Sequence, residues 1–152
     1  MRFTLFTAIV ALGALACGGE KQANQAQPAA GQASAAPASA GPVVEVKMTG
    51  NGSTTAAYEP AAITIAPGTT VRFINVSGGP HNIAFWGDSI PAGAATVLAA
   101  ALPNSIDQLT GAFLMQPNET YDVSFANAPT GTYKGYCTPH LALGMKIAIT
   151  VR

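Results

Sequence analysis

The sequence predicts an all-β domain, and two observations carry that prediction. Short runs rich in Val, Ile, Thr and aromatic residues recur between Pro42 and Arg152, and clusters of Gly, Pro, Asn and Ser separate them. Several of the runs alternate apolar and polar residues with a period of two, as half-buried strands do. Short strands divided by regularly spaced turns are typical of a two-sheet antiparallel sandwich. We therefore expect one sandwich domain over residues 42–152.

Eight segments of the domain fit strands. They are 43–48, 62–65, 69–76, 81–85, 112–115, 121–125, 132–137 and 146–151. In the third segment Val71 and Phe73 alternate with Arg72 and Ile74, so the two pairs are expected on opposite faces of a sheet. Two methionines, Met48 and Met115, fall within strand patterns, and both are expected in the core.

One short surface helix is expected in the irregular stretch between residues 88 and 107. The segment from Ala94 to Leu102 is rich in Ala and Leu, which favour helix, and Pro103 ends the pattern.

The first 41 residues are predicted to lie outside the domain. Residues 1–16 have a short basic start and an apolar run too short to span a bilayer comfortably, as in a signal peptide. Cys17 then follows the small residue Ala16, which resembles a bacterial lipoprotein signal in which Cys17 is lipidated, although Leu15 stands one position later than usual. Ordinary cleavage, giving a soluble exported protein, is the alternative. Residues 17–41 have a linker-like Ala, Gln, Ser, Gly and Pro composition, for which disorder is expected.

Charge excludes one class of partner. The chain has 152 residues with seven basic and seven acidic side chains, and no run or stripe of Lys and Arg marks a nucleic-acid surface. We expect a monomer. Cys17 and Cys137 are the two cysteines of the chain. A disulfide between them is disfavoured because it would join a flexible tail to an ordered loop, and because it would consume the Cys137 thiol, for which a motif indicates another use.

That use is indicated by a motif near the C-terminus. Cys137, His140 and Met145 follow one another with the spacing Cys-x2-His-x4-Met, and the only other histidine is His81. A thiolate, two imidazoles and a weak axial thioether form the ligand set of a blue-copper electron-transfer site. The competing interpretation is a copper-free sandwich with a buried free Cys, a packed Met and two surface histidines.

The pattern Gly-Thr-Tyr-x-x-Tyr-Cys-x-Pro-His-x4-Met, with Pro80-His81-Asn82 upstream, resembles the plastocyanin branch of the cupredoxins. The resemblance covers about residues 42–152. It implies a two-sheet Greek-key sandwich that holds one copper ion and exchanges one electron through Cu(I) and Cu(II). The ligands that it implies are His81, Cys137, His140 and Met145.

The resemblance also implies roles for neighbouring residues. The Asn82 side chain is expected to tie the His81 segment to the cysteine loop near Thr138, and Pro80 and Pro139 restrict the backbone beside each histidine.

Partner contacts are expected around His140, whose ring edge reaches the surface in this family. Leu141, Ala142 and Leu143 form a candidate apolar docking patch for a redox partner. Tyr133 and Tyr136 match aromatic positions near a second docking face, but the acidic cluster that accompanies that face in plants is absent.

The sequence thus predicts an exported one-electron carrier, not an enzyme. It would exchange electrons in transient contacts with membrane-associated redox proteins on the periplasmic side of a bacterial membrane. Copper storage or delivery is the main alternative. An oxidase or nitrite reductase fragment would need more histidines, and a binuclear copper centre would need a second Cys in the loop. A metal-free adhesion domain is the remaining alternative.

Overall fold

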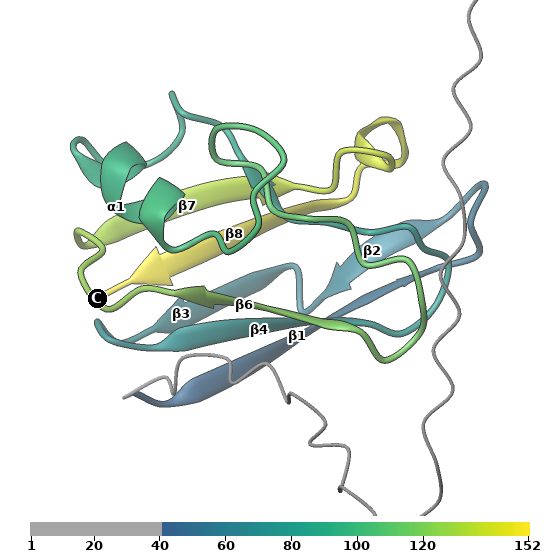
Figure 1. Ribbon diagram of the computed structural model, residues 1–152, viewed down its shortest axis with the longest axis horizontal. Coiled ribbons are helices and arrows are strands. Elements are labelled where there is room, and N and C mark those ends of the chain that lie inside the picture. Colours follow the sequence, from purple (N-terminus) through teal and green to yellow (C-terminus); the bar gives the residue numbers. More distant parts are fainter. Residues whose placement is uncertain (1–40) are drawn as a thin grey trace, which may run out of the picture. The chain divides into compact units, whose positions relative to one another are not determined.

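Two four-stranded sheets pack face to face in residues 41–152, the part of the chain that this computed structural model describes (Figure 1). The strand order of the first sheet is β2 (Ala56–Glu59), β1 (Val43–Gly50), β4 (Thr70–Asn75), β6 (Thr120–Ser124). The order of the second is β3 (Ala62–Ile65), β8 (Lys146–Val151), β7 (Gly131–Tyr136), β5 (Ala84–Phe85). The all-β prediction is confirmed. The expected signal peptide, linker and lipidated Cys17 lie outside the described residues.

The sheets are mixed, so the expected antiparallel pairing holds for most neighbouring strands but not for all of them. Strand β1 runs parallel to β4, and β3 runs parallel to β8. The chain leaves the first sheet after β2, forms β3 in the second sheet, and returns to the first sheet as β4. A strand that re-enters a sheet through such a crossover can lie parallel to its neighbour.

The expected helix is present as α1 (Ala94–Ala100), and a 3-10 turn, η1 (Leu141–Leu143), lies between β7 and β8. Within the described residues no helix has the length and apolar character needed to cross a bilayer.

Three strand assignments differ from the expectation. The segment expected at 81–85 forms a strand only at Ala84 and Phe85. Strand β2 was not predicted, because its four residues include two alanines, which have low strand propensity. Residues 112–115 form no strand, since only Leu114 pairs there, in an isolated bridge with His81. Leu114 points inward, so its neighbour Met115 points outward and is 58% exposed, which corrects its expected place in the core.

The core lies between the sheets. Val71 and Phe73 are fully buried, whereas Arg72 and Ile74 on the opposite face are half-buried, as the alternation in the sequence predicted. Met48 is also fully buried. Each large side chain removed from water in this way contributes about 1.5–3 kcal/mol.

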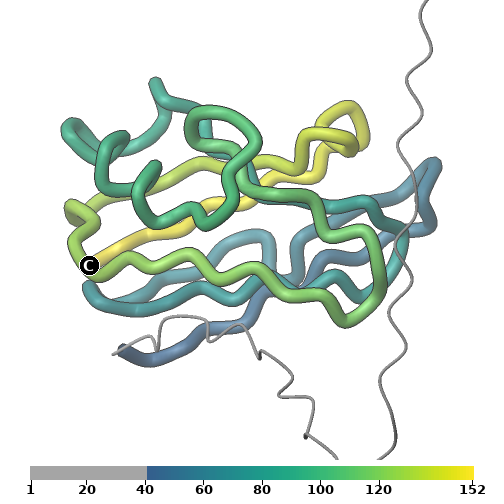
Figure 2. The backbone as a smooth tube through the Cα atoms, in the orientation of Figure 1, coloured from purple at the N-terminus to yellow at the C-terminus, as the bar shows by residue number. Residues whose placement is uncertain are grey.

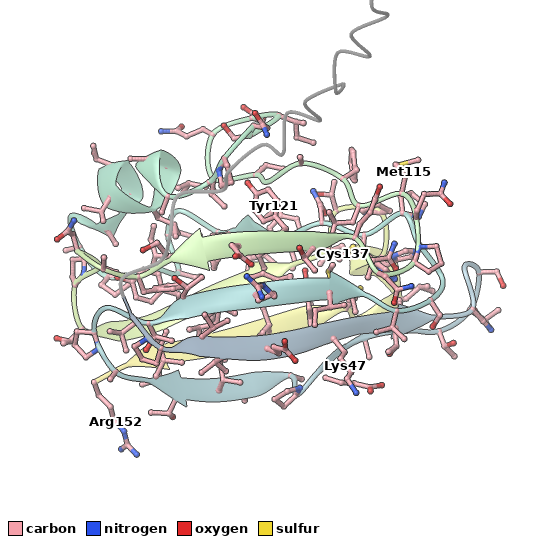
Figure 3. All side chains as sticks on the ribbon, turned by 60° about the horizontal axis from the view of Figure 1, so that its bottom comes forward. Lys47, Met115, Tyr121, Cys137 and Arg152 are labelled. Atoms are coloured by element: carbon pink, nitrogen blue, oxygen red, sulfur yellow. The ribbon has the colours of Figure 1, made fainter. Side chains whose placement is uncertain are left out.

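The core ends in a loop that bears the copper-ligand motif. Figure 2 shows that the connection between β7 and β8 lies at the end of the sandwich opposite to the C-terminus. Figure 3 places Cys137 between the layers, where it is fully buried.

Candidate metal centre

Three ligand-type atoms converge at this end of the sandwich. The Cys137 Sγ atom lies 3.7 Å from His81 Nδ1 and 3.5 Å from His140 Nδ1, and the two Nδ1 atoms are 3.1 Å apart. All three residues are buried: His81 and Cys137 are 0% exposed and His140 is 6% exposed. The structure thus brings together two segments that lie almost 60 residues apart in the chain.

The backbone of the loop fixes the positions of its three ligand-type residues. Cys137 follows the last residue of β7, and its N–H donates to the Met145 carbonyl at 3.1 Å. The Met145 N–H donates to the His140 carbonyl at 3.2 Å, and the His140 N–H donates to the Cys137 carbonyl at 3.2 Å. Gly144 has a φ of 82°, a left-handed conformation that glycine adopts without a steric penalty. Met145 is 1% exposed, which leaves its side chain inside the protein.

The orientation of the His81 ring follows from one hydrogen bond. Its Nε2 lies 2.9 Å from the Ser77 carbonyl oxygen. A carbonyl only accepts, so Nε2 carries the proton and Nδ1 presents a lone pair to Cys137 and His140. Second partners of this kind fix the ring orientation and tautomer of metal-bound histidines.

The electrostatics of the pocket favour a neutral His140 ring in the absence of a metal. Burial and the nearby His81 lower the pKa of His140. Burial raises the pKa of the Cys137 thiol, while the backbone N–H groups of Asn82 and His140 act in the opposite direction by donating to the sulfur. These two amides are already placed to stabilise a thiolate.

The donor set fits copper. Among the described residues the cluster contains sulfur and imidazole nitrogen but no carboxylate, and it is closed to solvent. Soft thiolate and imidazole ligands suit copper, and two His and one Cys with a weak axial Met are typical of its blue sites.

The residues expected to support the ligands lie where the sequence placed them. The Asn82 side chain donates to Thr138 Oγ1 at 3.1 Å, and its Oδ1 accepts from the Thr138 N–H at 2.8 Å. Pro80 and Pro139 directly precede the two histidines, half-buried and exposed respectively.

The surface beside His140 is apolar. Leu141 and Leu143 are 36% and 37% exposed, and Ala142 between them is also exposed. Tyr133 is fully buried, so its own side chain offers no surface to a partner.

Tyr136 is half-buried, and its ring stacks on Trp86 with centroids 4.5 Å apart and planes 27° from parallel. The Lys146 Nζ atom lies 6.0 Å from the Trp86 ring. Trp86 and Lys146 were not predicted as part of any surface.

Two further residues near the site were missed. Ser77 acts through its backbone carbonyl, which any residue type supplies, so no sequence pattern could have identified it. Tyr58 lies in the short strand β2 and donates to the Asn82 carbonyl at 2.6 Å. The motif around the ligands carries no sign of this distant contact.

A thiolate and two imidazoles at one end of a two-sheet sandwich define the class of single-site copper proteins with the cupredoxin fold. A family model described as copper binding proteins of the plastocyanin/azurin family matches residues 44–152. The chain belongs to this family.

Individual relatives agree with that assignment. The chain is 42% identical over 118 residues to plastocyanin from Prochlorothrix hollandica, which covers 78% of this chain and 79% of that protein. It is 40% identical over 106 residues to chloroplastic plastocyanin from Physcomitrium patens, 70% of this chain but only 56% of that protein. The structure of oxidised plastocyanin from Dryopteris crassirhizoma superposes with a TM-score of 0.54 and 31% identity, over 72% of this chain and all of that one. The protein is therefore a plastocyanin-like copper electron carrier and not an enzyme.

Proposed function

We propose that the protein is exported and carries single electrons between membrane-associated redox partners by cycling one copper ion between Cu(I) and Cu(II). The observation that carries this proposal is the convergence of Cys137 Sγ with the Nδ1 atoms of His81 and His140 in a closed pocket.

We assign the copper ligands as these three residues, with Met145 as a weak axial ligand. Bound copper supplies the one-electron change of charge. The chain supplies rigidity, because the His81 ring is held by the Ser77 carbonyl and the loop is closed by its own backbone hydrogen bonds. Burial of the cluster keeps water away from the ion.

Electrons would enter and leave on the His140 side, since His140 alone among the three buried residues has any exposed surface, 6% of the residue. The exposed residues Leu141, Ala142 and Leu143 would form the contact with a partner. Transient redox complexes have small interfaces, and a small apolar patch suits rapid release. Tyr136, next to Cys137 in the chain, offers a second approach through its stack with Trp86.

Export and membrane attachment rest on residues 1–17. We propose that Cys17 is lipidated and anchors the protein on the periplasmic side. Cell fractionation tests this: the intact chain should sediment with membranes, and Cys17→Ser should release it. If both forms sedimented with membranes, or if both were released, the result would contradict a lipid on Cys17.

Redox cycling separates a carrier from a storage or delivery protein. The copper-loaded protein should bleach with ascorbate, regain its colour with ferricyanide, and repeat the cycle without losing metal to an excess of a Cu(I) chelator. A delivery protein would surrender its copper to the chelator in the first reduced state, which would overturn the proposed function. The closed pocket supports the carrier, because delivery needs an exposed ion.

A further inference from the structure

The hydroxyl of Tyr58 lies beside the metal centre and has no part in the ligand set. Tyr58 belongs to β2, in the sheet that does not carry Cys137, and is 2% exposed. Its ring packs edge-on against Phe73, with centroids 5.8 Å apart and planes at 69°. Its hydroxyl donates to the Asn82 carbonyl oxygen over 2.6 Å, inside the protein.

Asn82 is the residue through which this hydroxyl reaches the site. It follows the candidate ligand His81, and its side chain bonds to Thr138 twice. Hydrogen bonding from its backbone N–H also lowers the pKa of the Cys137 thiol against the effect of burial. Its side chain also reaches the Gly111 carbonyl at 3.4 Å. Tyr58 therefore holds, from the opposite sheet, the backbone of a residue that contacts both halves of the site.

The Tyr58 hydroxyl is close enough to the centre to respond to its charge. Burial raises the pKa of Tyr58 well above its usual value, and the nearby Cys137 raises it further. The hydroxyl therefore stays protonated and serves as a permanent donor to Asn82.

We propose that Tyr58 is a positioning residue of the copper centre: it fixes the Asn82 backbone so that its N–H remains on the Cys137 sulfur, and thereby raises the reduction potential. The redox half of this inference rests on the proposed function. Hydrogen bonds to a copper-bound Cys sulfur tune the potential of such sites. An N–H donor stabilises the more electron-rich sulfur of the reduced state, so a loosened donor favours Cu(II).

Replacement of Tyr58 with Phe tests the inference, because it deletes the hydroxyl and keeps the ring that packs on Phe73. Tyr133→Phe is the matched control. Tyr133 is fully buried and also donates to a backbone carbonyl at 2.6 Å, that of Pro129. Tyr133 lies on β7, four residues before Cys137, which places the two residues about 13 Å apart along the extended chain.

In the copper-loaded protein, Tyr58→Phe should reduce the preference for Cu(I) over Cu(II) by three- to tenfold. For a one-electron couple this is a fall in potential of about 30–59 mV by protein-film voltammetry. Tyr133→Phe should leave the potential within about 10 mV of wild type, on the same scale. Equal potentials for the two variants, or a rise in Tyr58→Phe, would overturn the inference.

A second measurement needs no copper. In the metal-free protein, hydrogen exchange of the Asn82 amide measured by NMR should accelerate at least tenfold in Tyr58→Phe and stay unchanged in Tyr133→Phe. Unchanged exchange in Tyr58→Phe would contradict the positioning role. Failure of the wild-type chain to bind copper would instead overturn the proposed function, and the exchange rates would still decide whether Tyr58 holds Asn82.

Discussion

Asn82 and Thr138 stand 56 residues apart in the chain and are joined by two hydrogen bonds, one to the Thr138 hydroxyl at 3.1 Å and one from its N–H at 2.8 Å. This pair connects the segment that carries His81 with the loop that carries Cys137 and His140.

Replacing Asn82 with Ala should lower the free energy of unfolding by about 1–3 kcal/mol, because it leaves the Thr138 N–H without its partner. Of the two hydrogen bonds, Thr138→Ala removes only the one to the hydroxyl, and it should cost about 0.5–1.5 kcal/mol. Urea unfolding of the metal-free proteins measures both values. A loss in Thr138→Ala equal to or greater than that in Asn82→Ala would contradict the role assigned to this pair.

Gly135 tests the packing beneath the site. A Cβ atom at this position would lie 2.8 Å from Ile83 Cδ1, 3.0 Å from the Ala84 carbonyl oxygen and 3.2 Å from Ile147 Cγ2. Gly135→Ala should therefore cost about 1–3 kcal/mol through overpacking, measured by thermal or urea unfolding. Gly87→Ala is the control, since its Cβ would meet only Leu109 Cδ1 at 3.7 Å. Equal stabilities of the two variants would contradict the packing described for β5 and β7.

The stability of the metal-free protein should depend on pH through His140. The pKa of this residue is lowered in the folded state, so the unfolded chain binds the proton first as the pH falls. Stability is therefore lost below about pH 6.5, with a slope of at most about 1.4 kcal/mol per pH unit until the folded pKa is passed. Urea midpoints between pH 7.5 and 5 measure the slope, and His140→Gln should flatten it. A wild-type midpoint that rises on acidification would show that the sign is wrong.

The apolar patch beside His140 should control electron exchange between two copies of the protein. Leu143→Glu places a charge on an exposed position of the ligand loop, so two copies repel there, and the self-exchange rate measured by NMR should fall about tenfold or more. Thr64→Glu is the control. It adds the same charge at an exposed position of β3, which pairs with Thr150 at the end of β8 far from the ligand loop. Equal slowing in both variants would mean that net charge alone, and not the patch, governs exchange.

The sequence predicted which faces of the strands are buried, but not which strands lie next to each other. Alternate residues of β4 face opposite sides of the sheet, as the alternation of Val71 and Phe73 with Arg72 indicated, because side-chain burial follows a local period. The parallel pairing of β1 with β4 could not be read from that period, since alternation shows which face of a strand is buried but not which strand lies beside it.

The same limit applies around the site. The spacing of Cys137, His140 and Met145 is local, so the sequence displays it directly. The anchoring of His81 by Ser77 and of Asn82 by Tyr58 depends on backbone carbonyls, which leave no mark on residue type. Met115 was placed wrongly because adjacent residues of an extended segment point to opposite sides, and the sequence did not show that Leu114, and not Met115, is the one that faces the core.

Titration of the metal-free protein with Cu(II), followed by visible absorption and electron paramagnetic resonance, shows whether Cys137 and the two histidines hold one copper ion. We expect an intense blue thiolate-to-copper band that saturates at one equivalent of copper. The band should be lost in Cys137→Ala, while circular dichroism shows that the fold is retained. A colourless wild-type protein, or an unchanged band in Cys137→Ala, would contradict copper binding through Cys137.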